Sequence, residues 1–573
     1  MRVPGRGRPG LVGLALGAIV LGPALAPGFV LTYDMVFVPD PPATAAMFGL
    51  TGGFPRPVPS DAVVAGLAVA LPAEIVQKLI ILASFALAAW GAARLVPSSG
   101  GRLPRLAAAV FYVWNPYIAE RLLLGHWALL LGYAGLPWAT QAAASVAGRG
   151  GVARLTRSLV PAAVGGFAAM NISALVVLCV TALRPEWRRA VPRALLVIVG
   201  LSLPWLVPAV LQQFAGGGGS YGTDTAGVDL FAARADTPFG SLGSLLSLGG
   251  LWNREVVPAG LGAWPGATAR LALSLIAIAF FVAGLRRARG TDDWAAGLAV
   301  AAGIGLVIAC LGITEPGRAT LRSLIGLWPA FGVLRDAQVW IAPLALVEAV
   351  GLAAVVSFII RKGAVARGEA LVLAGLVAVA PIVLLPTFGW GIGGRLGAVQ
   401  YPPDWAAARR IVARDPVPGA VLSLPWAAHR QPAWNDHRTT LDPLPRALSR
   451  RVVWNDGLRV GGHALAPEDP VARRADALLR TPGNLTDSLR RAGYRFVIIA
   501  RDENQFQARL AGAQLVLNGT DLDVYKVPSP APFSEVGAPS APIVLTGDLI
   551  TLLLTLWSFG ASGSNLVALR TRE

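Results

Sequence analysis

Long apolar runs, separated by short loops rich in arginine, recur along most of the chain. A helix needs roughly 20 apolar residues to cross the ~30 Å hydrocarbon core of a bilayer, and several of the runs reach that length. The pattern therefore predicts a mainly α polytopic membrane protein. The predicted crossings lie at residues 11–31, 76–96, 104–118, 124–147, 158–183, 194–213, 268–286, 293–312, 338–360, 370–388 and 541–559.

The arginine clusters between the runs indicate how the crossings are oriented. Basic residues are enriched in cytoplasmic loops, so neighbouring clusters that all face the cytoplasm must be separated by an even number of crossings. Residues 158–183 are too few for two full crossings, and we expect a short or re-entrant pair that turns near Met170 and Asn171. This gives about twelve transmembrane helices with both termini cytoplasmic, and the first run stays as a span instead of being cleaved as a signal peptide. The clusters lie at residues 2–8, 94–105, 149–157, 184–193, 286–289, 361–367 and 570–572.

This topology leaves three long segments on the outer face of the plasma membrane. The second of them contains "FAGGGGSYGTDTAG" and is expected to be a flexible, glycine-rich loop. The outer segments are residues 32–75, 214–267 and 389–540. We therefore divide the chain into a helical domain (1–388), a small extracytoplasmic α/β domain (389–540), and a final span with a cytoplasmic tail (541–573).

The third outer segment alternates helical and β-like stretches, which is why we expect a domain there. Amphipathic stretches at 402–414 and 469–480 predict helices, and Asn518-Gly519 is a strong hairpin signal. The β-like runs lie at residues 419–426, 494–500 and 514–527.

Composition agrees with a membrane location and argues against a nucleic-acid partner. Hydrophobic residues make up 54% of the chain and charged residues only 14%, against about 25% in ordinary soluble domains. The net charge of +17 comes almost wholly from arginine, and many of the arginines sit in short loops between apolar runs. A nucleic-acid-binding protein would instead carry a basic soluble face.

Three polar clusters at the outer ends of spans are the candidates for chemistry. In "YVWNPYIAERLLLGHW", Asn115 is expected to cap a helix that starts at Pro116 and continues through the next span. That helix would place Glu120, Arg121 and His126 near the outer surface. Anchoring of the helix at the membrane interface is the structural alternative for these residues.

Of the other two clusters, one lies at the start of the first outer segment and the other lies where the chain re-enters the membrane. In "LTYDMVFVPDPP", Asp34 and Asp40 follow the first span, and partial burial at the surface is expected to raise the pKa of Asp34 and so suit it to base chemistry. In "GVLRDAQVW", Arg335, Asp336 and Gln338 are candidates for substrate binding, since the forked donors of arginine suit a phosphate.

Other polar residues give weaker signals. Glu348 lies near the middle of a predicted span, where a charge is costly and a functional role is the default hypothesis, with a protonated, hydrogen-bonded carboxyl as the alternative. His429 and His437 in "HRQPAWNDH" lack the compact spacing of a zinc site, so no metal site is assigned.

The segments "YDMVFVPDPP", "VWNPYIAERLLLGHWALLLGYAGLPW" and "FGVLRDAQVW", in this order, resemble membrane glycosyltransferases of the GT-C superfamily. More narrowly, the chain resembles actinobacterial polytopic proteins related to cell-wall arabinosyl- and mannosyltransferases. An α/β domain outside the membrane after the spans fits the same resemblance, which covers most of the chain.

The resemblance implies a polyprenyl-phosphate sugar donor, an envelope glycan or glycolipid acceptor, and a catalytic acid in the first outer loop, matched here by Asp34. Arg121 or Arg335, with His126, would neutralise the phosphate as it leaves. Some members place a divalent metal beside their acids, so a metal stays an open alternative. This chain departs from the commonest pattern because Asp34 and Asp40 are not adjacent.

Two other functions stay open at this point. A transporter or flippase of lipid-linked envelope precursors would place its binding groups near the bilayer midplane, whereas most polar residues here gather at the outer ends of spans. A catalytically silent scaffold of the same fold is the second alternative. The enzyme hypothesis predicts that the side chains of Asp34, Glu120, Arg121, His126 and Arg335 converge on one outward-facing cavity.

Overall fold

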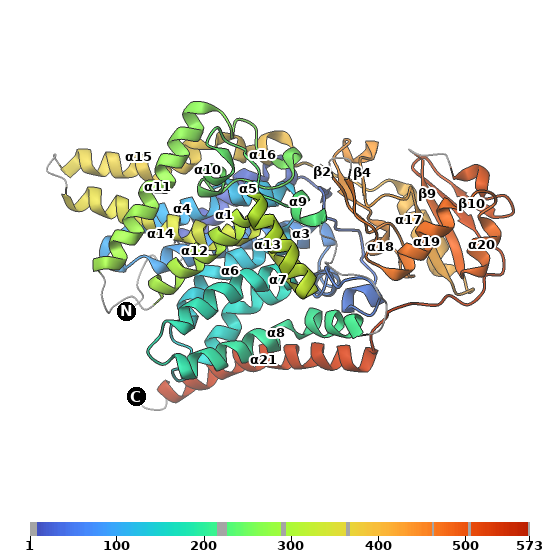
Figure 1. Cartoon of the computed structure of the whole chain (residues 1–573), viewed down its shortest axis with the longest axis horizontal. Helices are drawn as coiled ribbons and strands as arrows, with labels where there is room; N and C mark the ends of the chain where they lie inside the picture. Colours follow the sequence, from blue (N-terminus) through green and yellow to red (C-terminus); the bar gives the residue numbers. More distant parts are fainter. Residues whose placement is uncertain are drawn as a thin grey trace.

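The computed structural model describes residues 8–214, 226–287, 294–362, 367–460, 463–501 and 506–570. Most of the chain forms one helical part, and an α/β part packs against one end of it (Figure 1). The last helix, α21 (Ala541–Arg570), returns from the α/β part and runs along the helical part beside α8 (Trp187–Phe214). Most of the glycine-rich stretch predicted as a flexible loop lies outside the described residues.

Six helices of the described chain are long and apolar enough to cross a membrane, or up to eight if each of two bent pairs forms one span. The bent pairs are α12 (Ala295–Leu311) with α13 (Glu315–Leu327), at 99°, and α15 (Arg367–Leu384) with the short turns after it, at 60°. The polytopic helical fold is therefore confirmed, but a count of twelve crossings is not. Besides α8 and α21, the long helices are α3 (Ala73–Leu95), α7 (Gly151–Ala182), α11 (Trp264–Arg287) and α14 (Ala342–Lys362).

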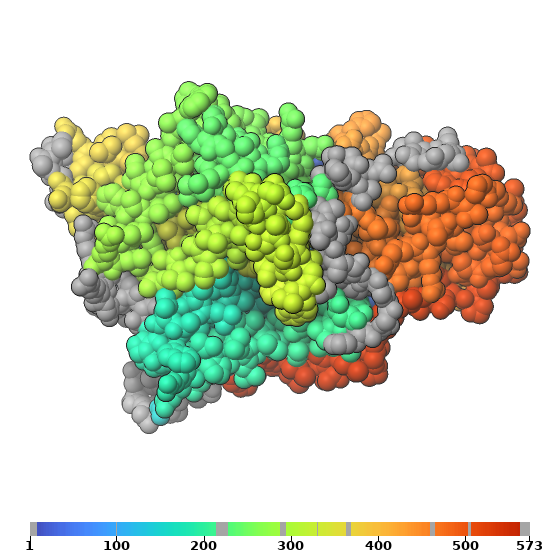
Figure 2. All heavy atoms as spheres, viewed as in Figure 1, coloured from blue at the N-terminus to red at the C-terminus, as the bar shows by residue number. Residues whose placement is uncertain are grey.

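The outer faces of these helices are apolar. In α21, for example, Leu549, Leu552, Leu553 and Leu556 are each more than half exposed. Figure 2 shows this helix along the lower edge of the molecule, beneath the cyan atoms of the preceding helices. An exposed apolar surface of this kind is typical of a face that contacts lipid.

Helix α7 folds back on itself at Gly166. The backbone there is non-helical, with φ 76° and ψ −151°, a region that is essentially restricted to glycine. Pro161, before the bend, packs close to Gly135 of α6 (Trp127–Ala143). Ala169, after the bend, packs close to Gly132, one turn away on the same helix. Both halves of α7 therefore lie along α6. The arrangement matches the re-entrant pair expected at 158–183, with its turn a few residues earlier than predicted.

Three shorter helices carry or support the candidate residues. Helix α1 (Arg8–Leu21) precedes the first outer segment and packs on α3. Helix α4 (Arg102–Val113) leads into α5 (Pro116–Leu123), and α6 follows after a break.

The α/β part contains a five-stranded mixed sheet with the order β10-β11-β9-β3-β6. β3 pairs in parallel with β6 and β9, whereas β9, β11 and β10 pair antiparallel. The predicted hairpin is present, with Asn518 opposite Asp523, and the two predicted helices form as α17 (Pro403–Arg414) and α19 (Pro470–Arg480). The strands are β3 (Ala420–Leu424), β6 (Val452–Val453), β9 (Tyr494–Ala500), β10 (Gln514–Asn518) and β11 (Leu522–Lys526).

Backbone pairing joins the two parts next to the first outer segment. β1 (Phe29–Val30) pairs antiparallel with β2 (Ala398–Val399), which leads into the α/β part. Tyr33 then exchanges backbone hydrogen bonds with that part, donating to Thr439 at 2.7 Å and accepting from Leu441 at 2.8 Å. The segment after α1 is therefore fixed by two sets of backbone hydrogen bonds, one from β2 and one from Thr439 and Leu441.

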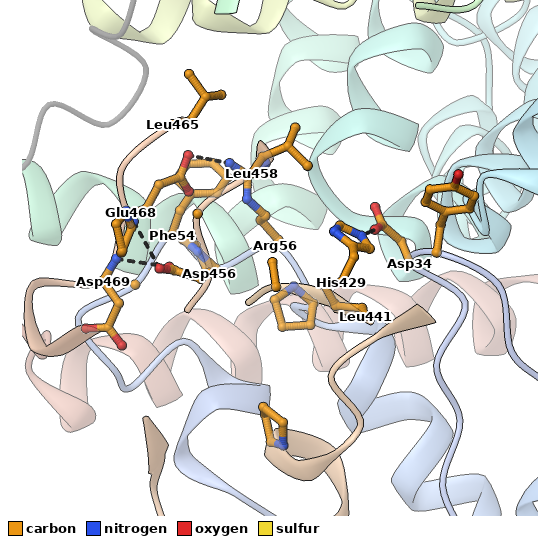
Figure 3. A pocket seen from close by; sticks show the side chains of 18 of the residues that line it. Asp34, Phe54, Arg56, His429, Leu441, Asp456, Leu458, Leu465, Glu468 and Asp469 are labelled. Atoms are coloured by element: carbon orange, nitrogen blue, oxygen red, sulfur yellow. Dashed lines mark hydrogen bonds and ion pairs between the residues drawn. The ribbon is translucent and has the colours of Figure 1, made fainter. Parts of the chain in front are cut away.

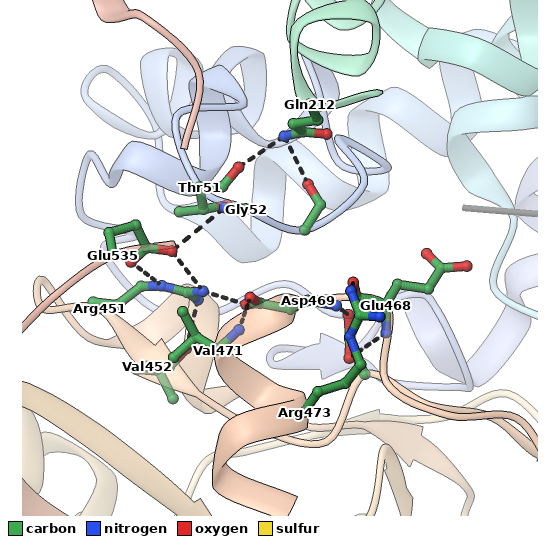
Figure 4. A network of polar contacts seen from close by, with 12 residues as sticks. Thr51, Gly52, Gln212, Arg451, Val452, Glu468, Asp469, Val471, Arg473 and Glu535 are labelled. Atoms are coloured by element: carbon green, nitrogen blue, oxygen red, sulfur yellow. Dashed lines mark hydrogen bonds and ion pairs between the residues drawn. The ribbon is translucent and has the colours of Figure 1, made fainter. Parts of the chain in front are cut away.

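A polar network makes a second junction between the parts (Figure 4). Arg451 of the α/β part binds the carboxylates of Asp469 and Glu535. Glu535 also accepts a hydrogen bond from the backbone of Gly52 in the first outer segment, at 3.4 Å. Gln212 of α8 donates to the carbonyl of Thr51 at 2.7 Å, so the network ties α8, this segment and the α/β part together.

The bend at Gly166 gives the first prediction. In Gly166→Ala a Cβ would lie 2.7 Å from the carbonyl oxygen of Val58 and the backbone would be strained, so we expect a loss of about 1–3 kcal/mol in the free energy of unfolding. The measurement is the thermal unfolding midpoint of the purified protein in detergent. Gly284→Ala in α11 is the matched control, since no atom lies within 4 Å of its Cβ; equal midpoints for the two variants would contradict the account.

Candidate active site

A cavity of about 2640 Å³ lies between the helical part and the α/β part. Small-molecule sites usually measure about 300–1,000 Å³, so this one has room for more than one ligand. Figure 3 shows side chains from both parts along its wall, with Asp34 at one end and Asp456, Glu468 and Asp469 at the other. Aromatic side chains also line it, including Phe54, Trp205, Trp252, Trp328, Phe331, Trp426 and Trp454.

Asp34 is held in this wall by two histidines from different parts of the molecule. One carboxylate oxygen, Oδ2, lies 3.3 Å from Nε2 of His126, which precedes α6. The other, Oδ1, lies 3.3 Å from Nε2 of His429 in the α/β part. The side chain of Asp34 is 48% exposed, and it lines the cavity. Both oxygens therefore accept hydrogen bonds while the carboxylate still faces the space where a ligand would bind.

The histidines reverse the expected pKa of Asp34. Burial by itself would raise this pKa, as the sequence argument supposed, but hydrogen bonds from His126 and His429 outweigh burial and hold the pKa well below its usual value. The expectation of a raised pKa is therefore wrong. A lowered pKa favours the ionised form of Asp34 and makes this carboxylate a weaker base on its own.

A break in the predicted helix brings His126 to Asp34. The expectation that one helix runs on from Pro116 through the next span is wrong, because the chain leaves α5 at Leu124 and takes φ 79° at Gly125. A side chain at Gly125 would collide with the backbone of Thr32 and Met35, so glycine permits the first outer segment to pack here. Asp34 donates its backbone N–H to the carbonyl of Leu124 at 3.2 Å in the same contact.

Behind His126, Arg121 forms a buried ion pair. Its guanidinium donates two parallel hydrogen bonds to Asp336, at 2.9 and 3.0 Å, and a third from Nε to Gln338 at 2.7 Å. The amide of Gln338 in turn donates to Glu120 at 2.7 Å. The side chain of Arg121 is fully buried, so its charge is neutralised inside the protein.

Arg121 also fixes the tautomer of His126. Its Nη1 lies 3.0 Å from Nδ1 of His126. Because arginine only donates hydrogen bonds, Nδ1 of His126 must accept, and the imidazole proton must sit on Nε2. Nε2 then donates to Asp34. A continuous set of hydrogen bonds thus links Asp336, Arg121, His126 and Asp34.

The structure brings most of the candidate residues together but gives them different positions. Asp34, His126, Arg335 and Asp336 line the cavity, whereas Glu120, Arg121 and Gln338 are buried behind it. Arg335 stacks over the ring of Phe231 at 5.1 Å.

Three other candidate residues also do not line the cavity. Asn115 is 2% exposed and caps α5, accepting from the N–H of Ile118 at 3.2 Å, which confirms its predicted role as a cap. Asp40 is not among the cavity-lining residues; its carboxylate is 90% exposed and points to Arg409 at 3.5 Å. Glu348 is also remote from the cavity lining, fully buried and hydrogen-bonded by Ser274 at 2.7 Å.

His429 is the residue that sequence reasoning missed. The local sequence suggests at most a metal ligand together with His437, and nothing in it connects His429 to Asp34, which lies almost 400 positions earlier. Among the described residues, no group of three or more His, Cys, Asp or Glu side chains is arranged to hold a metal ion. His429 comes close to Asp34 because Thr440, on the strand that pairs with the strand of His429, bridges to Tyr33. This is a tertiary contact, so the local sequence gives no signal for it.

Comparison with solved structures places the fold. The chain aligns with the cryo-EM structure of the arabinofuranosyltransferase AftD from Mycobacteria over 92% of its length, at 16% identity and a TM-score of 0.57. A mutant of AftD, R1389S, aligns over the same share at 16% identity and a TM-score of 0.54. The chain therefore has the same fold as the aligned part of AftD.

The match covers only part of the larger proteins. The chain spans about 40% of the length of AftD and 42% of the mutant. No protein-family model and no curated protein sequence matches the chain. The similarity therefore establishes the fold, and the activity has to be argued from the cavity.

The buried ion pair gives the second prediction. In Arg121→Met the carboxylate of Asp336 and the amide of Gln338 lose their partner, so we expect the free energy of unfolding to fall by about 3–5 kcal/mol. Arg335→Met is the matched control at the cavity wall, where we expect a much smaller change. Thermal unfolding in detergent measures both, and an Arg121→Met midpoint equal to that of the wild type would show that the pair contributes nothing to stability.

Proposed function

We propose that the chain is an integral membrane glycosyltransferase that transfers a sugar from a polyprenyl-phosphate donor to an envelope glycan or glycolipid. The observation that carries this proposal is the carboxyl group of Asp34, which two histidines hold at 3.3 Å in the wall of a large cavity bordered by the helical part. The GT-C fold supports it. The plasma membrane is the proposed location, with both termini cytoplasmic and residues 389–540 outside the cell.

The donor phosphate would be neutralised by Arg335 and not by Arg121. Arg335 lines the cavity, and an arginine fork matches phosphate oxygens well. Arg121 is fully buried, and its N–H groups are engaged by Asp336, Gln338 and His126. We therefore assign Arg121 to positioning His126.

Transfer requires that the acceptor hydroxyl lose its proton while the bond between the anomeric carbon and the phosphate breaks. Asp34 lies in the cavity wall, so a hydroxyl that attacks from this side would come next to it and its histidines. The leaving phosphate would gain negative charge on the Arg335 side. A single displacement of this kind would invert the configuration at the anomeric carbon.

The main alternatives are a transporter or flippase of lipid-linked precursors and a catalytically silent scaffold. A transporter should place its binding groups near the bilayer midplane. Glu348 is the one candidate from such a position, and it is buried against Ser274 away from the cavity lining. The acid–histidine cluster next to the first outer segment favours the enzyme. Membrane lipids would surround the protein, and no nucleic-acid partner is proposed.

The third prediction concerns activity. Purified wild-type protein in nanodiscs should transfer labelled sugar from polyprenyl-phosphate arabinose or mannose to a lipid-linked glycan acceptor. Asp34→Asn should lower kcat by roughly 10²–10⁴-fold, because the acid–base centre loses its charge. Asp40→Asn is the matched control, since its carboxylate does not line the cavity, and should retain activity.

Two results would argue against the proposal. Equal rates for the wild type and Asp34→Asn would remove Asp34 from the reaction. Donor binding by the wild type without sugar transfer to any acceptor would support the scaffold or transporter alternative.

A further inference from the structure

The two histidines that bind Asp34 differ in what their second nitrogen can do. Nδ1 of His126 is engaged by the guanidinium of Arg121 at 3.0 Å, and Nε2 already carries the proton that Asp34 accepts. A second proton on Nδ1 would break the contact with Arg121 and place two positive charges side by side. Both ring nitrogens of His126 are therefore engaged, and neither is free to accept a proton from a substrate.

His429 has no such constraint. Its Nε2 lies 3.3 Å from Asp34, but no hydrogen bond to its Nδ1 is found in the described part of the chain. The side chain is 21% exposed and lines the cavity, and Figure 3 places it between Arg56 and Asp34. A carboxylate that holds one imidazole nitrogen while the other faces a substrate site is the arrangement of a general base and the acid that orients it.

The fold fixes the position of His429 relative to Asp34. His429 lies on β4 (His429–Arg430), which pairs with β5 (Thr440–Leu441). β5 forms a bridge with Tyr33, the residue before Asp34. The imidazole also packs on the ring of Tyr33, with the ring centroids 5.8 Å apart. The β4–β5 pair, a two-stranded ribbon that carries His429, is thus held in a fixed position beside the segment that carries Asp34.

We infer that His429 is the general base of the reaction, with Nδ1 accepting the proton of the acceptor hydroxyl while Asp34 holds the Nε2–H. This inference rests on the proposed glycosyltransferase function and names the group that removes the proton. It also means that the α/β part contributes a catalytic residue, so the helical part alone would contain an incomplete site.

The step balances with the groups present. The acceptor O–H bond breaks, its proton goes to Nδ1, and the oxygen forms a bond with the anomeric carbon. The bond from that carbon to the donor phosphate breaks, and its electron pair leaves with the polyprenyl phosphate. The imidazolium, stabilised by ionised Asp34, then releases its proton to water in the cavity.

The charges around His429 are compatible with this role. Hydrogen bonds from the histidines hold the pKa of Asp34 below its usual value against the effect of burial, so Asp34 stays ionised and orients the imidazole. Arg56 is close enough to interact electrostatically with Asp34. On the same ribbon, Arg430 pairs with Asp442 at 2.5 Å. Burial and then Glu255 raise the pKa of Tyr33, which stays neutral.

The fourth prediction tests the base directly with His429→Gln. The Gln amide can still donate to Asp34 but cannot take up a proton. We expect kcat to fall by roughly 10²–10⁴-fold with little change in the KM for the donor. In the wild type, activity should rise with pH through the range in which imidazoles titrate, roughly pH 5–8, and this rise should disappear in His429→Gln.

Matched variants separate this role from a structural one. His126→Gln should keep the rise of activity with pH, and His437→Gln, an exposed histidine near the same ribbon, should behave as the wild type. A thermal midpoint of His429→Gln near that of the wild type would show that folding is intact. Addition of free imidazole to His429→Gly should partly restore transfer, a result that a purely structural role does not produce.

The outcomes also separate this inference from the proposed function. If the wild type transfers sugar and His429→Gln keeps both its rate and its pH dependence, His429 is not the base although the protein is a transferase. Loss of the pH dependence in His126→Gln instead would overturn the assignment in the same way. Absence of transfer by the wild type would count against the proposed function itself.

Discussion

The structure depends on the close approach of the first outer segment to the break between α5 and α6. Gly125 has no side chain, so the backbone of Thr32–Met35 can lie directly on it, and any Cβ there would overlap that backbone. The contact puts Asp34 beside His126. Pairing of Tyr33 with the α/β part on the other side brings His429 to the same carboxylate. The candidate site exists because one short segment is held between the two parts.

Much of the fold could be predicted from the sequence because its signals are local. Strands β3, β9, β10 and β11 appear in the sequence as β-like runs, and Asn518-Gly519 marks the hairpin between the last two, whereas the short strands β4, β5 and β6 were not predicted. Asn115-Pro116 marks the start of α5 in the same way. The re-entrant pair in α7 followed from its length between two arginine clusters. The number of crossings could not be predicted from the sequence. Several apolar helices are short or bent, and hydropathy alone does not distinguish a full crossing from a broken or re-entrant one.

The candidate site was predictable in part. The polar residues at the outer ends of spans stood out because charged groups are rare in so apolar a chain, and Asp34, His126 and Arg335 do meet at the cavity. Their individual roles did not follow from the sequence. Arg121 was one of two arginines expected to neutralise the phosphate, yet it is buried and paired with Asp336. His429 could not be linked to Asp34 because only the tertiary pairing of β5 with Tyr33 connects them.

A buried ion pair so close to the reaction centre has a cost in stability that its geometry partly offsets. The bidentate contact of Arg121 with Asp336 uses two of its donors, and the remaining contacts hold Gln338 and His126. We interpret this arrangement as a means of orientation, because it directs Nε2 of His126 toward Asp34. His429 is then the histidine that can accept a proton from a ligand bound in the cavity, as we propose.

The central claim is that both parts of the molecule form one reaction centre around Asp34. A cryo-EM structure of the protein in nanodiscs with polyprenyl phosphate tests it most directly. We expect the phosphate to bind in the cavity with Arg335 at hydrogen-bond distance, about 2.7–3.2 Å, while Asp34 keeps its contacts with His126 and His429. A phosphate bound outside the cavity, or an α/β part displaced so that His429 no longer reaches Asp34, would contradict it.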